Sequence, residues 1–110
     1  LYLNSIDILS ILIAGLVHDI GHPGFNNSYM VNSRSELACI YNDIHVLENY
    51  HCSEGYKIFL NSTTNILTNI EDSQFKIFRK RFIQIILSTD PSLHSKIISL
   101  IKKIKSLIMK

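Results

Sequence analysis

An apolar segment near the start of the chain constrains the fold most, because its spacing fits only a helix. Apolar side chains recur every three or four residues across residues 5–20, on more than one side of the predicted helix. Pro23 ends the helix, since the residue before a proline is displaced from the α region. His18 and Asp19 therefore fall in the last helical turn, and His22 lies just beyond it.

The rest of the chain repeats this spacing, and no segment alternates as a half-buried strand would. One domain accounts for all 110 residues. The sequence therefore predicts an all-α fold, a compact multi-helix bundle. Further helices are expected at residues 35–41, 44–60, 73–88 and 92–110, with loops at 26–28 and 61–72, and Pro91 closing or restarting a helix. The expected N-caps are Ser35, Asn42 with Asp43, and Asp72 or Ser73.

The distribution of charge along the chain limits the classes of partner that the protein could bind. Residues 1–55 carry six acids and one base, and residues 56–110 carry three acids and ten bases. We interpret the basic half as a solvated helix face, not as a nucleic-acid site.

Cys39 and Cys52 form no C-x-x-C pair, which favours a reducing cytoplasm over disulfides or a zinc knuckle. The longest nearly apolar run, residues 8–17, is too short for a transmembrane segment, and no signal peptide is recognised.

The end of the first helix carries residues that suggest chemistry. His18, Asp19 and His22 form an H-D-x-x-H pattern, and imidazole and carboxylate groups both bind divalent ions. Glu48 and His51 lie three residues apart on one face of a later helix, so this second pair could meet the first. Taken alone, these residues also fit ordinary roles: a polar pair, a surface glutamate and a core histidine.

Four linked blocks resemble the class I 3′,5′-cyclic-nucleotide phosphodiesterases. Residues 18–27 read H-D-I-G-H-P-G-F-N-N, which matches that family's H-D-x-x-H-P-G-x-x-N. Residues 35–43, 46–51 and 87–90 resemble its L-A-x-x-Y-N-D, V-L-E-N-H-H and L-A-T-D blocks, in the same order and spacing. The resemblance implies that residues 1–110 are the central part of a phosphodiesterase catalytic domain of the HD-domain type, incomplete at both ends.

The same resemblance implies metal-dependent hydrolysis of cAMP or cGMP to nucleoside 5′-monophosphates, in cyclic-nucleotide signalling. His18 and Asp19 match metal ligands, with Asp19 bridging a Zn²⁺ ion and a Mg²⁺ or Mn²⁺ ion. His22, Glu48 and Thr89 match residues that hydrogen-bond the metal-bound waters. The family's two other metal ligands, its general-acid histidine and its base-reading glutamine would lie outside this chain. So would any regulatory domain and any segment that attaches this cytoplasmic protein to a membrane.

Four positions depart from the family pattern. Gly21 stands where Asp is common, His45 where Ser is usual, Tyr50 in place of the first paired His, and Pro91 where Met or Leu follows T-D. None of them matches a metal ligand, so we expect activity to survive. We expect Pro91 to reshape the pocket rim and Gly21 to leave one outer hydrogen bond without its usual acceptor.

Two alternatives stay open. One is another HD-type metal phosphohydrolase or a helical di-metal oxygenase, since both place His and carboxylates on helices. The other is an inactive fragment whose basic helix, residues 92–110, binds lipid or a calmodulin-type partner. We favour the simpler interpretation, in which the apolar stripe of that helix covers a catalytic core. Because the chain looks cut at Leu1 and Lys110, its first helix is expected to expose Ile8, Ile11, Leu12 and Leu16.

Overall fold

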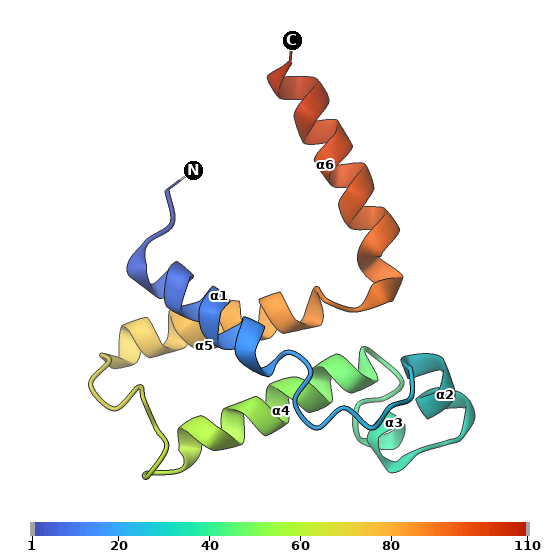
Figure 1. The fold of residues 1–110 in the computed structure, drawn as a ribbon, viewed down its shortest axis with the longest axis horizontal. Coiled ribbons are helices and arrows are strands. Elements are labelled where there is room, and N and C mark those ends of the chain that lie inside the picture. Colours follow the sequence, from blue (N-terminus) through green and yellow to red (C-terminus); the bar gives the residue numbers. More distant parts are fainter. Residues whose placement is uncertain (1, 110) are drawn as a thin grey trace.

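The computed structural model describes residues 2–109, and the regular elements in that range are all helices, which confirms the all-α prediction. α1, α4 and α5 form the main body, α2 and α3 lie near one end of α4, and α6 projects away beyond α5 (Figure 1). No described helix is long and apolar enough to cross a membrane. The elements are α1 (Ser5–Val17), α2 (Asn27–Asn32), α3 (Glu36–Ile40), α4 (Val46–Leu60), α5 (Asp72–Leu87), the 3₁₀ helix η1 (Pro91–Leu93) and α6 (His94–Ile108).

α1 begins with a reciprocal cap and ends in a tight turn. The Asn4 side chain accepts a hydrogen bond from the Asp7 N–H at 2.9 Å, and the Asp7 carboxylate accepts one from the Asn4 N–H at 3.0 Å. The helix stops at Val17 and not at residue 20. The chain then turns through Gly21, whose φ of +68° favours glycine. This turn holds the polar residues that follow α1 against α4.

Three further local predictions, one loop and two helix caps, are wrong. The predicted loop is instead the start of α2, since the Asn26 side chain accepts from the N–H three residues later and caps a helix. Neither Asn42 nor Asp43 caps α4: both have positive φ, and a left-handed His45 precedes the helix without a side-chain cap. At α5 the N-cap residue is Glu71, also without a side-chain bond.

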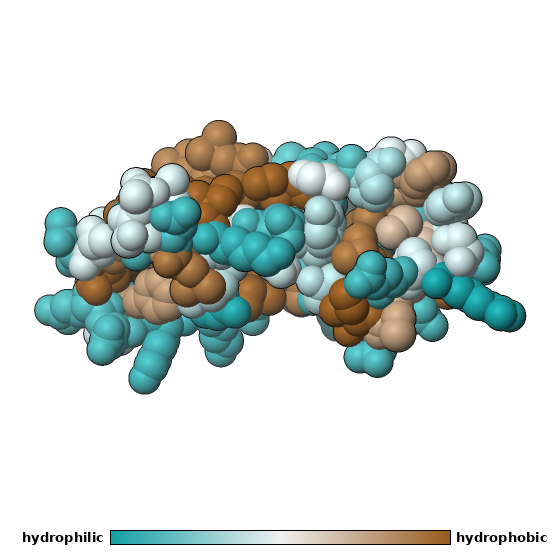
Figure 2. Space-filling model, turned by 90° about the horizontal axis from the view of Figure 1, so that it is seen from below, coloured by the Kyte–Doolittle hydropathy of each residue, from teal (hydrophilic) through white to brown (hydrophobic). Residues whose placement is uncertain are grey.

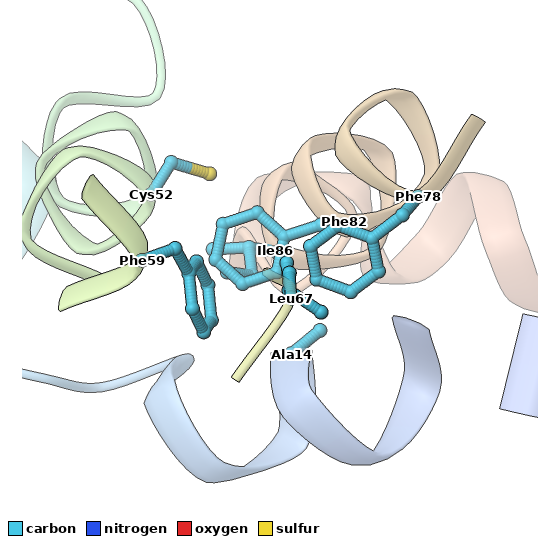
Figure 3. Packing of buried hydrophobic residues seen from close by; sticks show 7 residues of the cluster. All are labelled: Ala14, Cys52, Phe59, Leu67, Phe78, Phe82 and Ile86. Atoms are coloured by element: carbon cyan, nitrogen blue, oxygen red, sulfur yellow. The ribbon is translucent and has the colours of Figure 1, made fainter. Parts of the chain in front are cut away.

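The main core lies where α1 crosses α5 and α4 packs alongside. Phe59 of α4 meets Phe78 and Phe82 of α5 nearly edge-on, with ring centroids 5.8 and 5.7 Å apart. Ala14 of α1 packs against this cluster and is fully buried (Figure 3). Its small side chain lets α1 approach the aromatic rings closely. The core therefore fixes the end of α1, and the turn after it, relative to α4.

Phe82→Ala should lower the unfolding free energy of the native protein by about 3–5 kcal/mol. The ring is fully buried between Phe59 and Phe78, so its removal leaves a cavity that the neighbouring helices can only partly close. Phe25→Ala is the control, because Phe25 is 48% exposed and should change stability by less than about 1 kcal/mol. Denaturant unfolding measures both variants, and equal destabilisation would contradict this core.

α6 is amphipathic but packs against little of the described chain. None of its residues is buried. Apolar patches also appear between polar side chains on the face drawn in Figure 2. The predicted exposure of one side of α1 is confirmed at Ile8, Ile11, Leu12 and Leu16, with Leu16 81% exposed. Residues 2–109 do not cover the apolar stripe of α6, so the burial of this stripe against a catalytic core stays a prediction. The expected cut ends at Leu1 and Lys110 lie outside the described residues.

Candidate active site

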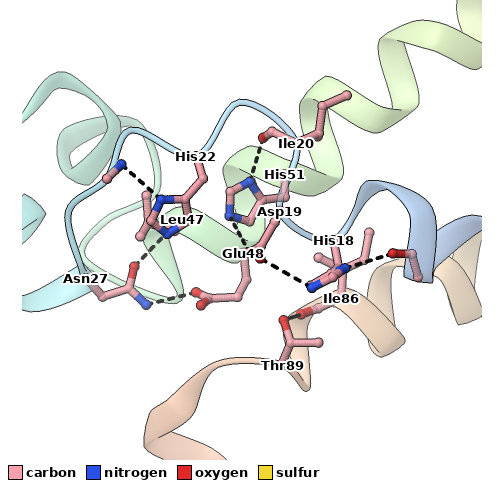
Figure 4. A network of polar contacts seen from close by, with 12 residues as sticks. His18, Asp19, Ile20, His22, Asn27, Leu47, Glu48, His51, Ile86 and Thr89 are labelled. Atoms are coloured by element: carbon pink, nitrogen blue, oxygen red, sulfur yellow. Dashed lines mark hydrogen bonds and ion pairs between the residues drawn. The ribbon is translucent and has the colours of Figure 1, made fainter.

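A cavity of about 320 Å³ opens where the turn after α1 meets the first half of α4. Its walls come from three segments that are far apart in sequence: the stretch after α1, α4, and the residues after α5 (Figure 4). The fold brings together every site residue that the sequence predicts. These residues are His18, Asp19, His22, Glu48 and Thr89.

His18 is held in one tautomer by its own helix. Its Nδ1 lies 2.8 Å from the Gly15 carbonyl oxygen, which can only accept, so Nδ1 donates its proton there. In the neutral ring, the lone pair of Nε2 then faces Asp19 Oδ2 at 3.3 Å. Two acceptors repel at this distance unless a cation or a proton lies between them. Metal-binding histidines are usually fixed in this way, through a donor bond from the other ring nitrogen.

His51 presents the same arrangement to the other oxygen of Asp19. It is 2% exposed, and its Nδ1 donates to the Ile20 carbonyl oxygen at 2.7 Å. Its Nε2 lies 3.8 Å from Asp19 Oδ1. Two imidazole nitrogens thus converge on one carboxylate, a set of donors that suits a divalent cation. The predicted meeting of the two carboxylate and imidazole pairs is confirmed through His51.

His22 has the opposite tautomer. Its Nδ1 accepts a hydrogen bond from the Gly24 N–H at 3.0 Å, so a neutral ring carries its proton on Nε2. Asp19, His22 and His51 each offer an atom within 4.8 Å of the others and together could surround an ion. The tautomer of His22 nevertheless suits donation to a water or a phosphate oxygen better than metal ligation.

Glu48 is buried, with 6% of its surface exposed, so the surface-glutamate alternative is wrong. Its Oε2 accepts a hydrogen bond from Asn27 Nδ2 at 2.9 Å, and Asn27 Oδ1 accepts one from the Leu47 N–H at 2.9 Å. Asn27 therefore ties the turn after α1 to the start of α4 and orients the carboxylate. Sequence reasoning did not single out Asn27, although it is the last residue of the H-D-x-x-H-P-G-x-x-N motif.

Thr89 and Pro91 form the wall opposite α4. The Thr89 hydroxyl donates to the Ile86 carbonyl oxygen at 2.7 Å, which leaves its oxygen lone pairs free to accept. Pro91 lines the cavity and begins η1. This position agrees with the prediction that Pro91 shapes the pocket rim.

Gly21 and Tyr50, two of the departures from the family pattern, share one space. A Cβ atom added to Gly21 would lie 2.9 Å from Tyr50 Oη. The positive φ of Gly21 would strain any larger residue as well. The Tyr50 side chain thus occupies the volume that a larger residue at position 21 would need, a coupling that the sequence alone did not reveal.

A second polar pair lies beside the cavity. His45 Nδ1 donates to Asp90 Oδ2 at 2.5 Å, and Asp90 is 7% exposed. Burial raises the pKa of the Asp90 carboxyl, but the hydrogen bonds from His45 and Ser92 outweigh burial and leave this pKa below its ordinary value. Asp90 is therefore ionised at neutral pH. His45, Glu48 and Asp90 also offer atoms within 4.8 Å of one another, but both carboxylates already accept hydrogen bonds.

Comparison with known proteins identifies relatives of this chain. The family model of 3′5′-cyclic nucleotide phosphodiesterases matches residues 1–109. The "3′,5′-cyclic-nucleotide phosphodiesterase regA" of Dictyostelium discoideum is 46% identical over 93 residues, 84% of this chain and 12% of that protein. The "Dual 3′,5′-cyclic-AMP and -GMP phosphodiesterase beta" of Plasmodium falciparum is 50% identical over 91 residues, 83% of this chain and 8% of that protein.

A solved structure supports the same relationship. The phosphodiesterase domain of the RhoPDE fusion protein from the choanoflagellate Salpingoeca rosetta matches with a TM-score of 0.93 and 38% identity. The match covers 96% of this chain and 33% of that one. The chain thus spans a small part of these curated relatives and a third of the solved domain. Because the family model covers nearly the whole sequence and the fold agrees, the chain belongs to the 3′,5′-cyclic nucleotide phosphodiesterase family.

Proposed function

We propose that the native protein hydrolyses 3′,5′-cyclic nucleotides to nucleoside 5′-monophosphates with divalent metal ions. The observation that carries the proposal is the Asp19 carboxylate, which faces Nε2 of both His18 and His51 beside a cavity. Membership of the family supports the reaction class. One relative named as a cyclic-nucleotide phosphodiesterase and one named as a dual cyclic-AMP and -GMP phosphodiesterase support the substrate class.

His18 and Asp19 would hold the ions, for which the family resemblance suggests Zn²⁺ with Mg²⁺ or Mn²⁺. When bound, such ions supply a water of lowered pKa and offset the phosphate charge. The chain's own residues would orient the water and the substrate. His22 can donate from Nε2, the Thr89 oxygen can accept, and Glu48 can accept through the oxygen that Asn27 does not hold.

Turnover assays on the native protein test this proposal. Both cAMP and cGMP are supplied with Zn²⁺ and Mg²⁺, and the 5′-monophosphate product is measured by chromatography. We expect chelation to stop the reaction and metal to restore it. A protein that leaves both cyclic nucleotides intact but hydrolyses other phosphate esters would instead be an HD-type phosphohydrolase of another class.

Glu48→Gln should lower kcat by about 10²-fold or more while changing KM less. A glutamine can still accept the Asn27 hydrogen bond through its amide oxygen, so the fold should be kept. The second carboxylate oxygen of Glu48 is replaced by an NH₂ group, which donates a hydrogen bond where the carboxylate accepted one. Steady-state kinetics with both cyclic nucleotides measures the effect.

Glu36→Gln is the matched control, because Glu36 is exposed in the first turn of α3. It should leave kcat and KM unchanged. A purely structural role for Glu48 would have another signature: Glu48→Gln would melt at a lower temperature while its folded fraction turned over normally. That result would remove Glu48 from the proposed mechanism.

We further propose a cytoplasmic location, with regulatory domains encoded outside this chain. Cys39 and Cys52 are both free, which suits a reducing compartment. One solved relative is the phosphodiesterase domain of a fusion protein, which supports additional domains in this one. Fractionation of cells that express the native protein tests the location.

A further inference from the structure

The His45 side chain joins two walls of the cavity. His45 directly precedes α4, and Asp90 lies between α5 and η1. The His45 Nδ1 donates to Asp90 Oδ2 at 2.5 Å although 45 positions separate the two residues. Among residues 2–109, this is the only hydrogen bond between the 88–93 segment and α4 or the turn before it. In the described residues, the separation of the two walls is therefore set by the packing of α4 on α5 and by this one hydrogen bond.

Asp90 divides its carboxylate between two partners. Its Oδ1 accepts from the Ser92 N–H at 2.8 Å and caps the start of η1, while its Oδ2 accepts from His45. Because Asp90 is 7% exposed, loss of the imidazole would leave a buried carboxylate oxygen without its donor. The backbone around Asp90 would then shift until water or another donor reached that oxygen.

His45 adopts a backbone conformation that is uncommon for residues other than glycine. Its φ is 42° and its ψ is 51°, in the left-handed region, and its side chain makes no capping bond to α4. Its carbonyl oxygen accepts from the Asn49 N–H at 2.8 Å, so the same residue begins the helix. An unfavourable conformation persists where the surroundings impose it, often next to a functional site. Here the imposed conformation directs the imidazole to the opposite wall.

The contact lies next to both sides of the cavity. Thr89 and Pro91, the neighbours of Asp90, line one wall, and Glu48 on the other wall lies nearly one helical turn after His45. The separation of Thr89 from Glu48 decides whether both can contact one water or one phosphate. A displacement of about 1 Å is enough to lose most of the rate enhancement that comes from such positioning.

We propose that His45 is a positioning residue, which acts through Asp90 to set the separation of Thr89 from Glu48 across the cavity. The inference rests on the proposed function, because its effect appears in the rate of cyclic-nucleotide hydrolysis. His45 does not line the cavity, and its hydrogen bond to Asp90 is the contact through which it acts on the opposite wall.

Two substitutions in the native protein separate the effect of the His45–Asp90 hydrogen bond from the effect of the left-handed backbone at position 45. His45→Gly removes the imidazole and tolerates the left-handed conformation. His45→Asn also tolerates this conformation and keeps an N–H donor at the δ position, where Nδ1 lies in histidine. We expect His45→Gly to lower kcat by about 10- to 100-fold with KM changed less than about threefold, and His45→Asn to recover most of kcat. His94→Asn, at an exposed residue that begins α6, is the control and should match the wild type.

A double-mutant cycle tests whether the effect passes through Thr89. In a Thr89→Val background, His45→Gly should lower kcat by less than about twofold further. Independent, additive losses would overturn the proposal, as would wild-type kinetics for His45→Gly or equal losses for the Gly and Asn variants. A wild-type protein that hydrolyses neither cyclic nucleotide would instead refute the proposed function itself.

Discussion

Asp19→Ala should abolish the cyclic-nucleotide hydrolysis that we propose for the native protein. This carboxylate faces Nε2 of both His18 and His51, so its loss removes the negative charge between the two rings and the pair of oxygens that could bridge two ions. His18→Ala should do nearly the same, because it removes a nitrogen that its own helix fixes toward the carboxylate. Steady-state turnover of cAMP and cGMP, together with metal content by atomic emission, measures both variants.

Asp72→Ala is the control for this experiment, because it removes an exposed carboxylate from the first turn of α5. It should keep both turnover and metal. The Asp19 side chain is 67% exposed, so its loss should change the melting temperature little. Near wild-type activity of Asp19→Ala after chelation and Mg²⁺ replacement would show that the metal assignment is wrong.

Residues 1–110 produced alone should be inactive and should lose zinc on dialysis. The chain matches 33% of the solved phosphodiesterase domain, and the family resemblance assigns two metal ligands to residues outside this chain, so the shell of roughly four ligands that a zinc ion needs would be incomplete. The family resemblance also assigns the general acid to a histidine outside this chain. Without that acid, the leaving oxygen departs unprotonated, which typically costs a further factor of about 10²–10⁴.

The isolated chain should also aggregate while remaining helical. Leu12 and Leu16 of α1 are 61% and 81% exposed, and the apolar side chains of α6 are uncovered within residues 2–109. Size-exclusion chromatography, circular dichroism and metal analysis check these expectations, with the native protein as the control. A monomeric chain that holds one zinc ion and hydrolyses cGMP would contradict them.

The helices could be predicted because the features that specify them, apolar spacing and capping residues, lie within the helical segments themselves. The periodic apolar residues of α1 and α5 appear in the sequence at helical spacing, and Ser35 caps α3 as its position suggests, by accepting from the Ala38 N–H at 3.1 Å. The cap of α4 was not predictable in this way. Its start depends on the left-handed His45, which is bonded to a residue 45 positions away.

The site was predictable where motif residues act close to their own position. His18 and Asp19 directly follow α1, although the spacing placed them in its last turn, and Pro91 reaches the cavity wall. The tautomers of the histidines and the burial of the site residues could be determined only from the fold, since they depend on partners such as the Ile20 carbonyl oxygen for His51. The shared space of Gly21 and Tyr50 also appears only when α4 packs on the turn.

The packing of α1 on α5 has a consequence for biosynthesis. α1 is synthesised before the aromatic residues Phe78 and Phe82, which pack in the same buried cluster as Ala14. At roughly 5–20 residues per second, the nascent apolar helix waits several seconds without its partner. During this interval it is a natural target for a chaperone that recognises apolar segments. The half of the cavity formed by the turn after α1 therefore acquires its geometry late, once translation has delivered α5.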